Sequence, residues 1–256
     1  MRILLCGARG YMGKEIVKLC EAGFRGATLA AGIDPSEGEE DFRIFSSAKE
    51  VEGVEADVIV DFSHHTAAAE ITELAAGLGI PAVIATTGHT EAELDAIYRA
   101  ARSIPVFFAA NMSVGVALLC ELAKKAAAAF PDADIEIVER HHTRKLDAPS
   151  GTALTLAKEI CEVRPEAYIS TGRSGRSVRD KNEIGIQSVR IGNVVGDHEI
   201  QIATEAETIT LKHEAHSRSL FAQGALSAAS FIIGKSAGIY GMKDMLAKEA
   251  VEVGVK

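Results

Sequence analysis

A glycine-rich turn joins an apolar segment to a helical one at the start of the chain. Residues 3–6 are apolar and predict a buried strand, and the spacing of apolar residues over 12–21 predicts a helix. Between them stands Gly7-Ala8-Arg9-Gly10-Tyr11-Met12-Gly13. Backbone without side chains lets a pyrophosphate approach the N–H groups at a helix N-terminus. The spacing is G-x-x-G-x-x-G instead of G-x-G-x-x-G, so a tight turn without a ligand is the alternative.

Strands and helices alternate over the first hundred residues. We expect further strands over 27–33, 57–62, 81–86 and 105–109, and helices over 66–79 and after Thr90, where Thr90 and Glu93 form a capping box. The acidic segment 36–56 predicts a loop with one short strand or helix. Such alternation indicates βαβ units and a parallel sheet.

The pattern changes after residue 113. A long helix over 114–130 precedes a strand over 135–142 and a second helix that starts at Ser150. A Gly-, Ser- and Arg-rich loop over 171–180 is followed by strands without intervening helices, over 185–191, 197–203 and 207–214. This order predicts an antiparallel or mixed sheet, hence a second domain of different class. The helical segment 221–245 is suited to cap either domain. The chain is therefore expected to be α/β with a smaller α+β domain.

Composition narrows the possible partners. With 27 Lys and Arg against 36 Asp and Glu, the formal net charge is -9, which argues against nucleic-acid and anionic-membrane binding. The four cysteines are far apart and neither they nor the histidines have metal spacing, so we expect no metal site and buried thiols in a reducing compartment. The apolar runs are too short for a membrane span or a signal peptide. We expect a cytoplasmic protein.

Asp34 bears on which dinucleotide is bound. It ends the second expected strand about 20 residues past the glycine turn, where a ribose-binding carboxylate is expected. A carboxylate there accepts from the ribose 2'-OH of NAD and repels the 2'-phosphate of NADP, by up to roughly 4 kcal/mol at about 4 Å. Pro35 offers no positive charge to offset this repulsion. Arg9, in the glycine turn, is the cation that could reach the 2'-phosphate instead. We predict a preference for NADH, with NADPH also used.

Two imidazoles, a guanidinium and an ammonium are crowded into His141-His142-Thr143-Arg144-Lys145. The chain then runs through Asp147-Ala148-Pro149 into Ser150-Gly151-Thr152, which predicts a helix start. Proton donors beside a helix N-terminus are what an enzyme needs to hold a small carboxylate and protonate the molecule that carries it. A solvated basic loop followed by an ordinary capped helix is the alternative.

These segments together resemble the dihydrodipicolinate reductase family over essentially the whole chain. The most specific match is the segment from Glu139 to Ala153, that is Glu-Arg-His-His-Thr-Arg-Lys-Leu-Asp-Ala-Pro-Ser-Gly-Thr-Ala. The glycine turn, Ala85-Thr86-Thr87-Gly88 and the segment from Phe108 to Gly115 also match. Ala85 stands where the family usually has Gly.

The resemblance implies a Rossmann-type dinucleotide-binding domain of residues 1–112 completed by 222–256. Residues 113–221 would then form the substrate-binding and oligomerisation domain of a homotetramer. The implied reaction is reduction of 4-hydroxy-tetrahydrodipicolinate by NAD(P)H to tetrahydrodipicolinate, with release of water, in lysine and diaminopimelate biosynthesis.

The resemblance also implies roles for individual residues. His141 is the expected proton donor or acceptor, and Lys145 a second donor. His142, Gly151 and Thr152, with Ser150 at the same helix start, are expected to bind the dicarboxylate. The expected cofactor contacts are Gly7, Ala8, Arg9, Gly10, Tyr11, Met12, Asp34, Ala85, Thr86, Thr87, Ala109, Ala110, Asn111 and Met112.

Two rival functions stay open on the residues alone. Another NAD-dependent dehydrogenase, such as an amino-acid dehydrogenase, explains the glycine turn and Asp34 but leaves the segment from His141 to Thr152 unexplained. A non-catalytic nicotinamide sensor would not need the His and Lys positions, which are intact.

The roles of several charged residues also stay open. His64 and His65 are expected to be loop or cap residues, with a cofactor contact as the alternative. Asp147 orients either Lys145 or Arg144. Arg218 either closes over the substrate or forms a surface ion pair, and Arg173 and Arg176 either serve a neighbouring subunit or face solvent.

Overall fold

The computed structural model describes the backbone of residues 1–253 and the side chains of residues 1–247. The chain divides into two compact units, one of residues 1–113 with 219–256 and one of residues 114–218. We call them the first and the second unit. In the part of the chain that is described, no helix has the length and apolar character needed to cross a membrane.

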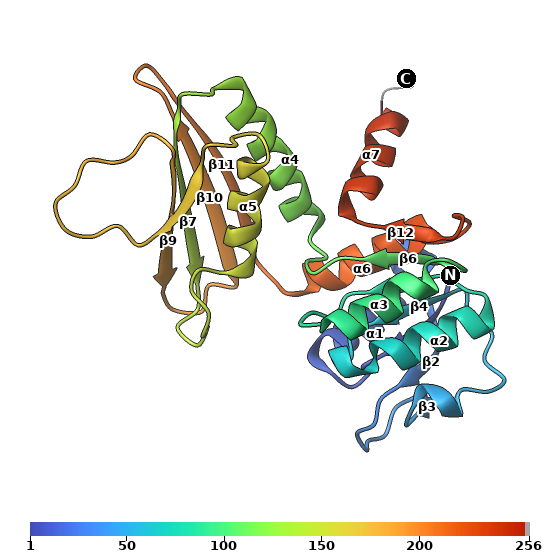
Figure 1. Ribbon diagram of the computed structural model, residues 1–256. Helices are drawn as coiled ribbons and strands as arrows, with labels where there is room; N and C mark the ends of the chain where they lie inside the picture. Colours follow the sequence, from blue (N-terminus) through green and yellow to red (C-terminus); the bar gives the residue numbers. More distant parts are fainter. Residues whose placement is uncertain (254–256) are drawn as a thin grey trace. The chain divides into compact units, whose positions relative to one another are not determined.

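A seven-stranded sheet, parallel in every pairing, forms the centre of the first unit (Figure 1). Its order is β12-β6-β5-β4-β1-β2-β3. The strands are β1 (Arg2–Cys6), β2 (Thr28–Ile33), β3 (Ile44–Phe45), β4 (Val58–Asp61), β5 (Ala82–Ile84), β6 (Pro105–Phe108) and β12 (Gly238–Tyr240). The order reverses between β1 and β4, which is the doubly wound arrangement that binds dinucleotides at the carboxyl ends of its strands. The predicted α/β class is thereby confirmed.

Helices pack in pairs on this sheet. α1 (Tyr11–Glu21) packs with α6 (Ser219–Ile232), and α2 (Ala68–Leu78) packs with α3 (Glu91–Ala100). The capping box of Thr90 and Glu93 is formed with both of its hydrogen bonds. Side chains without solvent exposure, including Leu4, Ile59, Ile84 and Val106, join the sheet to α2 and α3. The last helix is α7 (Met242–Val253).

The C-terminal segment belongs to the first unit. α6 contacts β4, β5 and β6, which settles the question of which domain it covers. Strand β12 was not predicted, since three residues are too few for a periodic pattern, yet it extends the sheet by pairing parallel to β6. The acidic segment 36–56 contains both β3 and a short 3-10 helix, Ala48–Glu50.

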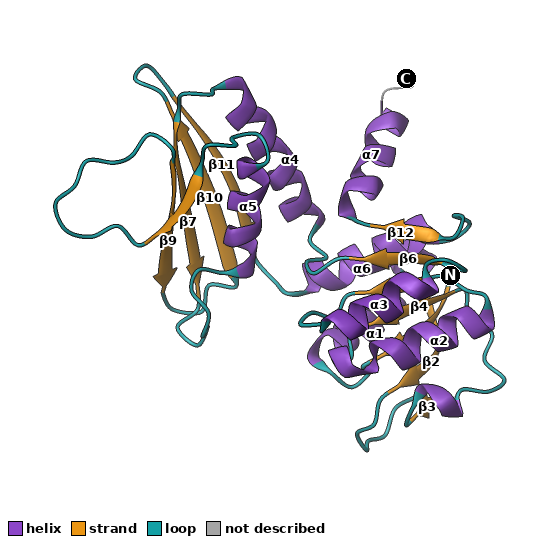
Figure 2. Ribbon diagram, viewed as in Figure 1, coloured by secondary structure: helices purple, strands orange, loops and turns teal. Residues whose placement is uncertain are grey.

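The second unit is a five-stranded mixed sheet covered on one face by two helices (Figures 1 and 2). Its order is β11-β10-β7-β9-β8, with parallel pairs β7–β9 and β8–β9 and antiparallel pairs β7–β10 and β10–β11. The elements are α4 (Val114–Ala129), β7 (Asp134–His141), α5 (Gly151–Cys161), β8 (Tyr168–Thr171), β9 (Glu183–Arg190), β10 (Gly196–Ala203) and β11 (Thr208–Ala215). Strand β8 was not predicted, and a long loop joins it to β9.

One core holds the second unit together. Alternate residues of β7, among them Ile135 and Ile137, pack against Leu156 and Ile160 of α5 and are almost completely buried. This alternation continues to the end of β7, where Glu139 and His141 occupy the same buried positions. The core face of the sheet therefore delivers two polar side chains to its carboxyl end.

Candidate functional site

The glycine turn between β1 and α1 is built so that side chains are excluded. Gly7 has a φ of +75°, and a Cβ there would lie 2.6 Å from the carbonyl oxygen of Phe62. A Cβ at Gly13 would lie 2.1 Å from the carbonyl oxygen of Gly7, so the first turn of α1 packs directly on the loop. Gly10 is the N-cap of α1 and offers no side chain to cap it. A helix N-terminus without a side-chain cap has the chemistry to receive the pyrophosphate of a dinucleotide.

Asp34 lies directly beside this turn, at the end of β2. Its Oδ2 accepts a 2.8 Å hydrogen bond from the backbone N–H of Arg9, and its Oδ1 accepts from the N–H and hydroxyl of Ser36. Burial acts to raise the pKa of Asp34, but the hydrogen bonds from Ser36 and Arg9 outweigh it and the pKa is lowered. The carboxylate is therefore ionised and held in place next to the glycines.

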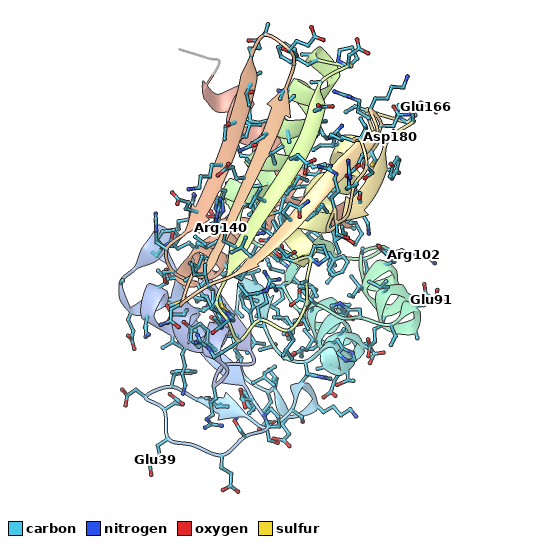
Figure 3. The ribbon with its side chains drawn as sticks, turned by 90° about the vertical axis from the view of Figure 1, so that its left-hand side faces the viewer. Glu39, Glu91, Arg102, Arg140, Glu166 and Asp180 are labelled. Carbon is cyan, nitrogen blue, oxygen red and sulfur yellow. The ribbon has the colours of Figure 1, made fainter. Side chains whose placement is uncertain are left out.

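The Arg9 side chain is engaged by the loop that follows Asp34. Its guanidinium donates to the carbonyl oxygens of Ser36 and Gly38 and lies 3.6 Å from the carboxylate of Glu40. The same loop carries Glu39 and further acidic residues, and Figure 3 shows Glu39 on its outer side. A concave surface beside Arg9 is lined by Gly38, Glu39, Glu40, Asp41, Phe42 and Ile44. The charge around this end of the site is predominantly negative.

The other predicted cofactor residues follow β5 and β6 at the same sheet edge. The Thr86 hydroxyl donates to Oδ2 of buried Asp61 at 2.9 Å, which ties the end of β5 to the end of β4. Burial raises the pKa of Asp61. Beyond β6, Oδ1 of Asn111 accepts from the N–H of Ser113 at 2.9 Å. Three groups of predicted residues share this edge because all their strands are parallel: Gly7 to Met12, Ala85 to Thr87 and Ala109 to Met112.

His64 and His65 have structural partners. His64 is the N-cap of a 3-10 helix and accepts from the N–H of Thr66. His65 lies 2.9 Å from the carboxylate of Glu93, and its ring is 4.2 Å from that of His64. These contacts agree with the expectation that the pair are loop and cap residues.

In the second unit, His141 is held by a buried carboxylate. Nδ1 of His141 lies 2.5 Å from Oε2 of Glu139, whose side chain has no solvent exposure. Burial acts to raise the pKa of Glu139, but hydrogen bonds from Arg190, Ser188 and His141 outweigh it and the pKa is lowered. Because the carboxylate is ionised, it accepts and Nδ1–H of His141 donates.

The same carboxylate connects β9 and α5. Arg190 donates to both oxygens of Glu139, at 2.9 and 2.8 Å, and also to the carbonyl oxygen of Asp147 at 2.6 Å. The backbone N–H of Ser150 donates to Oε1 at 3.2 Å. Glu139 therefore fixes His141 and the start of α5 with respect to each other.

Ser150 caps α5 and meets a second histidine. Its hydroxyl accepts from the N–H of Ala153 at 3.1 Å and lies 2.9 Å from Nε2 of His198 on β10. The rings of His141 and His198 meet edge to face with centroids 5.2 Å apart. Burial and the neighbouring charge of His141 lower the pKa of His198 to about 4, so this second ring is neutral at pH 7.

The remaining charged residues of the segment from Glu139 to Ala153 lie near His141 and Glu139. Nζ of Lys145 lies 2.7 Å from Oδ1 of Asp147, whereas Arg144 donates to Asn193, so Asp147 orients Lys145. Nε2 of His142 lies 3.4 Å from the Arg218 guanidinium. Burial, followed by the charges of Arg144, Arg218, His141 and Lys145, lowers the pKa of His142.

Gly151 opens α5 with unobstructed backbone. It is exposed, and a Cβ built on it meets no protein atom within 4 Å. Packing within the protein therefore gives no reason for a glycine at this position. The N–H groups of a first helical turn favour an anion, and the exposed Gly151 places no side chain over this helix start. The structure brings His141, His142, Lys145, Ser150, Gly151 and Thr152 to this one end of the second unit.

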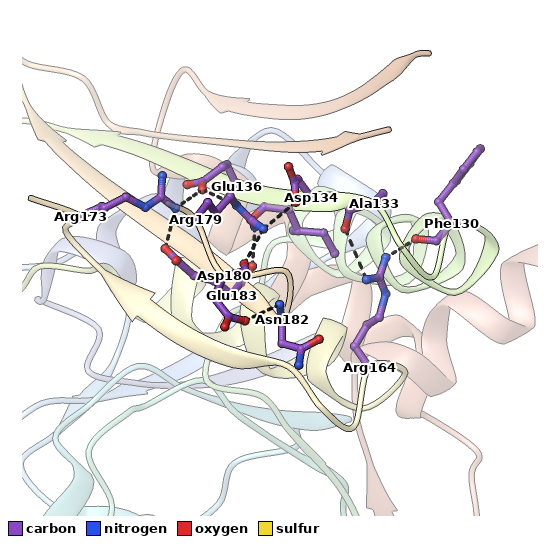
Figure 4. A network of polar contacts seen from close by, with 11 residues as sticks. Phe130, Ala133, Asp134, Glu136, Arg164, Arg173, Arg179, Asp180, Asn182 and Glu183 are labelled. Carbon is purple, nitrogen blue, oxygen red and sulfur yellow. Dashed lines mark hydrogen bonds and ion pairs between the residues drawn. The ribbon is translucent and has the colours of Figure 1, made fainter. Parts of the chain in front are cut away.

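Arg173 takes part in a separate ion-pair network (Figure 4). It contacts the carboxylates of Glu136 and Glu183 at 2.7 and 2.6 Å, and Arg179 contacts Asp134 and Glu136 at 2.7 and 3.3 Å. This network fastens the β8–β9 loop to β7. Arg176 is exposed.

Three of the residues that contact His141 or Ser150 were not predicted as site residues: Glu139, Arg190 and His198. The position of Glu139 could have been predicted from the sequence, because alternate residues of a strand share a face and Glu139 lies two residues before His141 in β7. Arg190 and His198 are brought in by strand pairing, since His141 pairs with Arg190 and Glu139 pairs with His198. That register joins segments about 50 residues apart and has no local signature.

Comparison with known proteins decides the family. Residues 1–112 match the family described as "Dihydrodipicolinate reductase, N-terminus", and residues 115–246 match "Dihydrodipicolinate reductase, C-terminus". The chain belongs to the dihydrodipicolinate reductase family. The resemblance inferred from the signature segment is thereby confirmed.

Relatives within this family match nearly the whole chain. The 4-hydroxy-tetrahydrodipicolinate reductase of Caldanaerobacter subterraneus subsp. tengcongensis is 44% identical over 97% of this chain and 99% of its own length. That of Clostridium tetani is 42% identical over 96% of this chain and 97% of its own length. Among solved structures, a dipicolinate-bound dihydrodipicolinate reductase from Paenisporosarcina sp. TG-14 is similar with a TM-score of 0.81 and 27% identity, covering 94% of this chain and 97% of that one.

Proposed function

We propose that this chain reduces 4-hydroxy-tetrahydrodipicolinate to tetrahydrodipicolinate with NAD(P)H, releasing water, in lysine and diaminopimelate biosynthesis. The observation that carries the proposal is the Glu139–His141 pair beside the open helix start at Gly151, within a family of this activity. It combines a proton donor with an anion-binding backbone, which is what reduction of a cyclic dicarboxylate requires.

The first unit is proposed to hold the dinucleotide. The uncapped N-terminus of α1 would take the pyrophosphate, and Asp34 the adenosine ribose; Thr86, Thr87 and the segment from Ala109 to Met112 would line the nicotinamide end. When bound, the cofactor supplies the hydride. The ionised Asp34 and the acidic loop at Glu39 and Glu40 support NADH as the preferred form, with NADPH weaker because its 2'-phosphate meets negative charge.

The second unit is proposed to hold the substrate by its carboxylates. One carboxylate would lie on the N–H groups at Gly151 and Thr152, where the helix dipole adds roughly 0.3–1 kcal/mol to the hydrogen bonds. His142, next to Arg218, and the Ser150 cap complete this side. Lys145, oriented by Asp147, provides a fixed positive charge or a second proton donor.

His141 is the proposed source of the proton. Loss of the 4-hydroxyl group with a neighbouring proton, as water, gives the ring a conjugated C=C–C=N system. Hydride addition to that system leaves an electron pair on the far atom, which must gain a proton. Imidazole serves this step well near neutral pH, and here Nδ1 is occupied by Glu139, so Nε2 is the nitrogen left to donate.

We also propose a homotetramer in the cytoplasm. In the second unit α4 and α5 lie on one face of the sheet (Figure 1). Residues of the other face, such as Val138 and Arg140, are partly exposed, and Figure 3 labels Arg140 on this sheet. A sheet face of this kind is suited to an interface between copies. Sedimentation of the purified protein tests the tetramer.

The competing function is an amino-acid dehydrogenase of similar architecture. It accounts for the glycine turn and Asp34 but gives no use to His141, Lys145 and Gly151. A coupled assay separates the two: a synthase that makes the substrate from pyruvate and aspartate semialdehyde is mixed with this chain, and NADH absorbance is followed. We expect NADH consumption that depends on the synthase, whereas an amino-acid dehydrogenase leaves NADH unchanged under these conditions.

A further inference from the structure

Glu139 is a fully buried carboxylate near the carboxyl end of β7 that accepts several hydrogen bonds. It accepts from Nδ1 of His141, from Arg190 at both oxygens and from the N–H of Ser150. A buried ion pair contributes little to stability compared with apolar residues of similar size. Stability alone therefore gives a weak reason for a charge at this position, and its orientation toward His141 gives a stronger one.

The opposite edge of the His141 ring faces a glycine. A Cβ at Gly196, the first residue of β10, would lie 2.9 Å from Nε2 of His141 and 3.3 Å from its Cδ2. The backbone of Gly196 is not in the left-handed region, so an alanine is compatible with its conformation. The imidazole is the nearest group that an added methyl would meet.

We propose that Glu139 and Gly196 are positioning residues for His141, the carboxylate holding Nδ1 while the glycine leaves room for Nε2 to face the substrate. This proposal rests on the proposed role of His141 as proton donor. When the Nε2 proton passes to the substrate atom that holds the new electron pair, the ring becomes neutral with its remaining proton on Nδ1. That proton stays hydrogen-bonded to Glu139, and the carboxylate remains ionised throughout.

The titratable groups around the His141 ring come from β9, β10 and the segment that follows β7. Arg190 of β9 is bound to the same carboxylate, neutral His198 of β10 lies against the ring, and Lys145 and His142 contribute from the segment after β7. Glu139 is the one negative group hydrogen-bonded to His141 among these described residues. Removing its charge leaves the His141 ring near the cations Arg190 and Lys145 without the carboxylate that balances them.

The first test replaces the carboxylate by an amide. Glu139→Gln is compared with Glu136→Gln, which lies on the same strand and is also bound by arginines, Arg173 and Arg179, but does not contact His141. We expect Glu139→Gln to lower kcat by about 10²–10⁴-fold, since the amide also permits the wrong ring tautomer. The alkaline limb of the kcat/KM profile should move to lower pH. Glu136→Gln should leave both quantities unchanged.

The second test moves the ring without changing any charge. In Gly196→Ala the methyl pushes on Nε2 of His141, whereas in Gly185→Ala the methyl meets the carboxylate of Glu136. We expect Gly196→Ala to lower kcat at least about tenfold with the KM for NADH unchanged, because a small displacement of a proton donor slows transfer. This variant keeps the proposal testable should Glu139→Gln fail to fold.

Failure of this proposal is distinct from failure of the proposed function. If the unaltered protein consumes no NADH with substrate, the function itself is wrong. If it is active but Gly196→Ala retains kcat within about twofold of Gly185→Ala, the positioning role is overturned. A Glu139→Gln protein whose pH profile matches that of Glu136→Gln overturns it equally.

Discussion

The backbone N–H of Arg9 donates a 2.8 Å hydrogen bond to Oδ2 of Asp34. This contact joins the glycine turn to the end of β2, so the two parts of the proposed dinucleotide site are held by the protein itself. It also holds an ionised carboxylate beside the glycine turn, where we propose that the adenosine ribose binds.

Cofactor preference follows from that carboxylate. Asp34→Asn removes the charge and keeps the size, and we expect the ratio of kcat/KM for NADPH to that for NADH to rise about tenfold or more. Asp95→Asn, exposed on α3, is the matched control and should leave the ratio unchanged. A tenfold preference for NADPH in the unaltered protein contradicts this interpretation of Asp34.

Substrate binding at the start of α5 is tested by Gly151→Ala. The added methyl meets no protein atom, so the free energy of unfolding should stay the same or rise by up to about 1 kcal/mol. The KM for substrate should rise by about 10–100-fold, since a hydrogen bond to a charged group contributes roughly 1.5–3 kcal/mol. Urea unfolding and steady-state kinetics on the same samples decide the matter. An unchanged KM removes Gly151 from the site.

Lys145 and Asp147 should differ in their effects. Lys145→Met deletes the charge and a possible donor, so we expect kcat/KM to fall by about 10²-fold or more. Asp147→Asn leaves the amine but loosens its 2.7 Å contact, so a loss below about tenfold is expected. Arg144→Gln, whose guanidinium contacts Asn193, is the control. Equal losses of kcat/KM in all three variants would show that the activity depends on the charges of this loop in general and not on Lys145 in particular.

Acid should destabilise the protein through His198. Its pKa falls from 6.5 in the unfolded chain to about 4 in the fold, so the unfolded state binds more protons between these values and stability falls as pH drops from 6.5 toward 4. Each pKa unit corresponds to about 1.4 kcal/mol, so a shift from 6.5 to about 4 gives at most roughly 3–4 kcal/mol. Urea unfolding at pH 7, 5.5 and 4.5 measures this loss at fixed protein concentration. His198→Gln should flatten the dependence, and His216→Gln, at an exposed position, should not; equal slopes would contradict the assignment.

Local patterns predicted much of this fold from the sequence. The parallel sheet of the first unit follows from buried apolar runs separated by amphipathic helices, and the Thr90 capping box and the Ser150 cap are formed as expected. The strands that were missed, β8 and β12, are three or four residues long and owe their existence to pairing with β9 and β6. Pairing of this kind is a tertiary effect that no short window contains.

The candidate site also contains residues that local sequence predicted and residues that only strand pairing brings in. His141, Lys145 and the helix start lie within one segment, so residue type and spacing pointed to them. Arg190 and His198 reach His141 through the register of the second sheet, and sequence reasoning left them without a role. The function of Asp147 was ambiguous until the 2.7 Å contact with Lys145 distinguished it from Arg144.

The central claim is that His141 delivers the proton in an NAD(P)H-dependent reduction, and His141→Gln in the synthase-coupled assay tests it most directly. Glutamine keeps a polar side chain of similar reach without a transferable proton, and we expect kcat to fall by about 10²–10⁴-fold while the KM for NADH is unchanged. A near-normal kcat would contradict the account and assign the proton to Lys145 or to water.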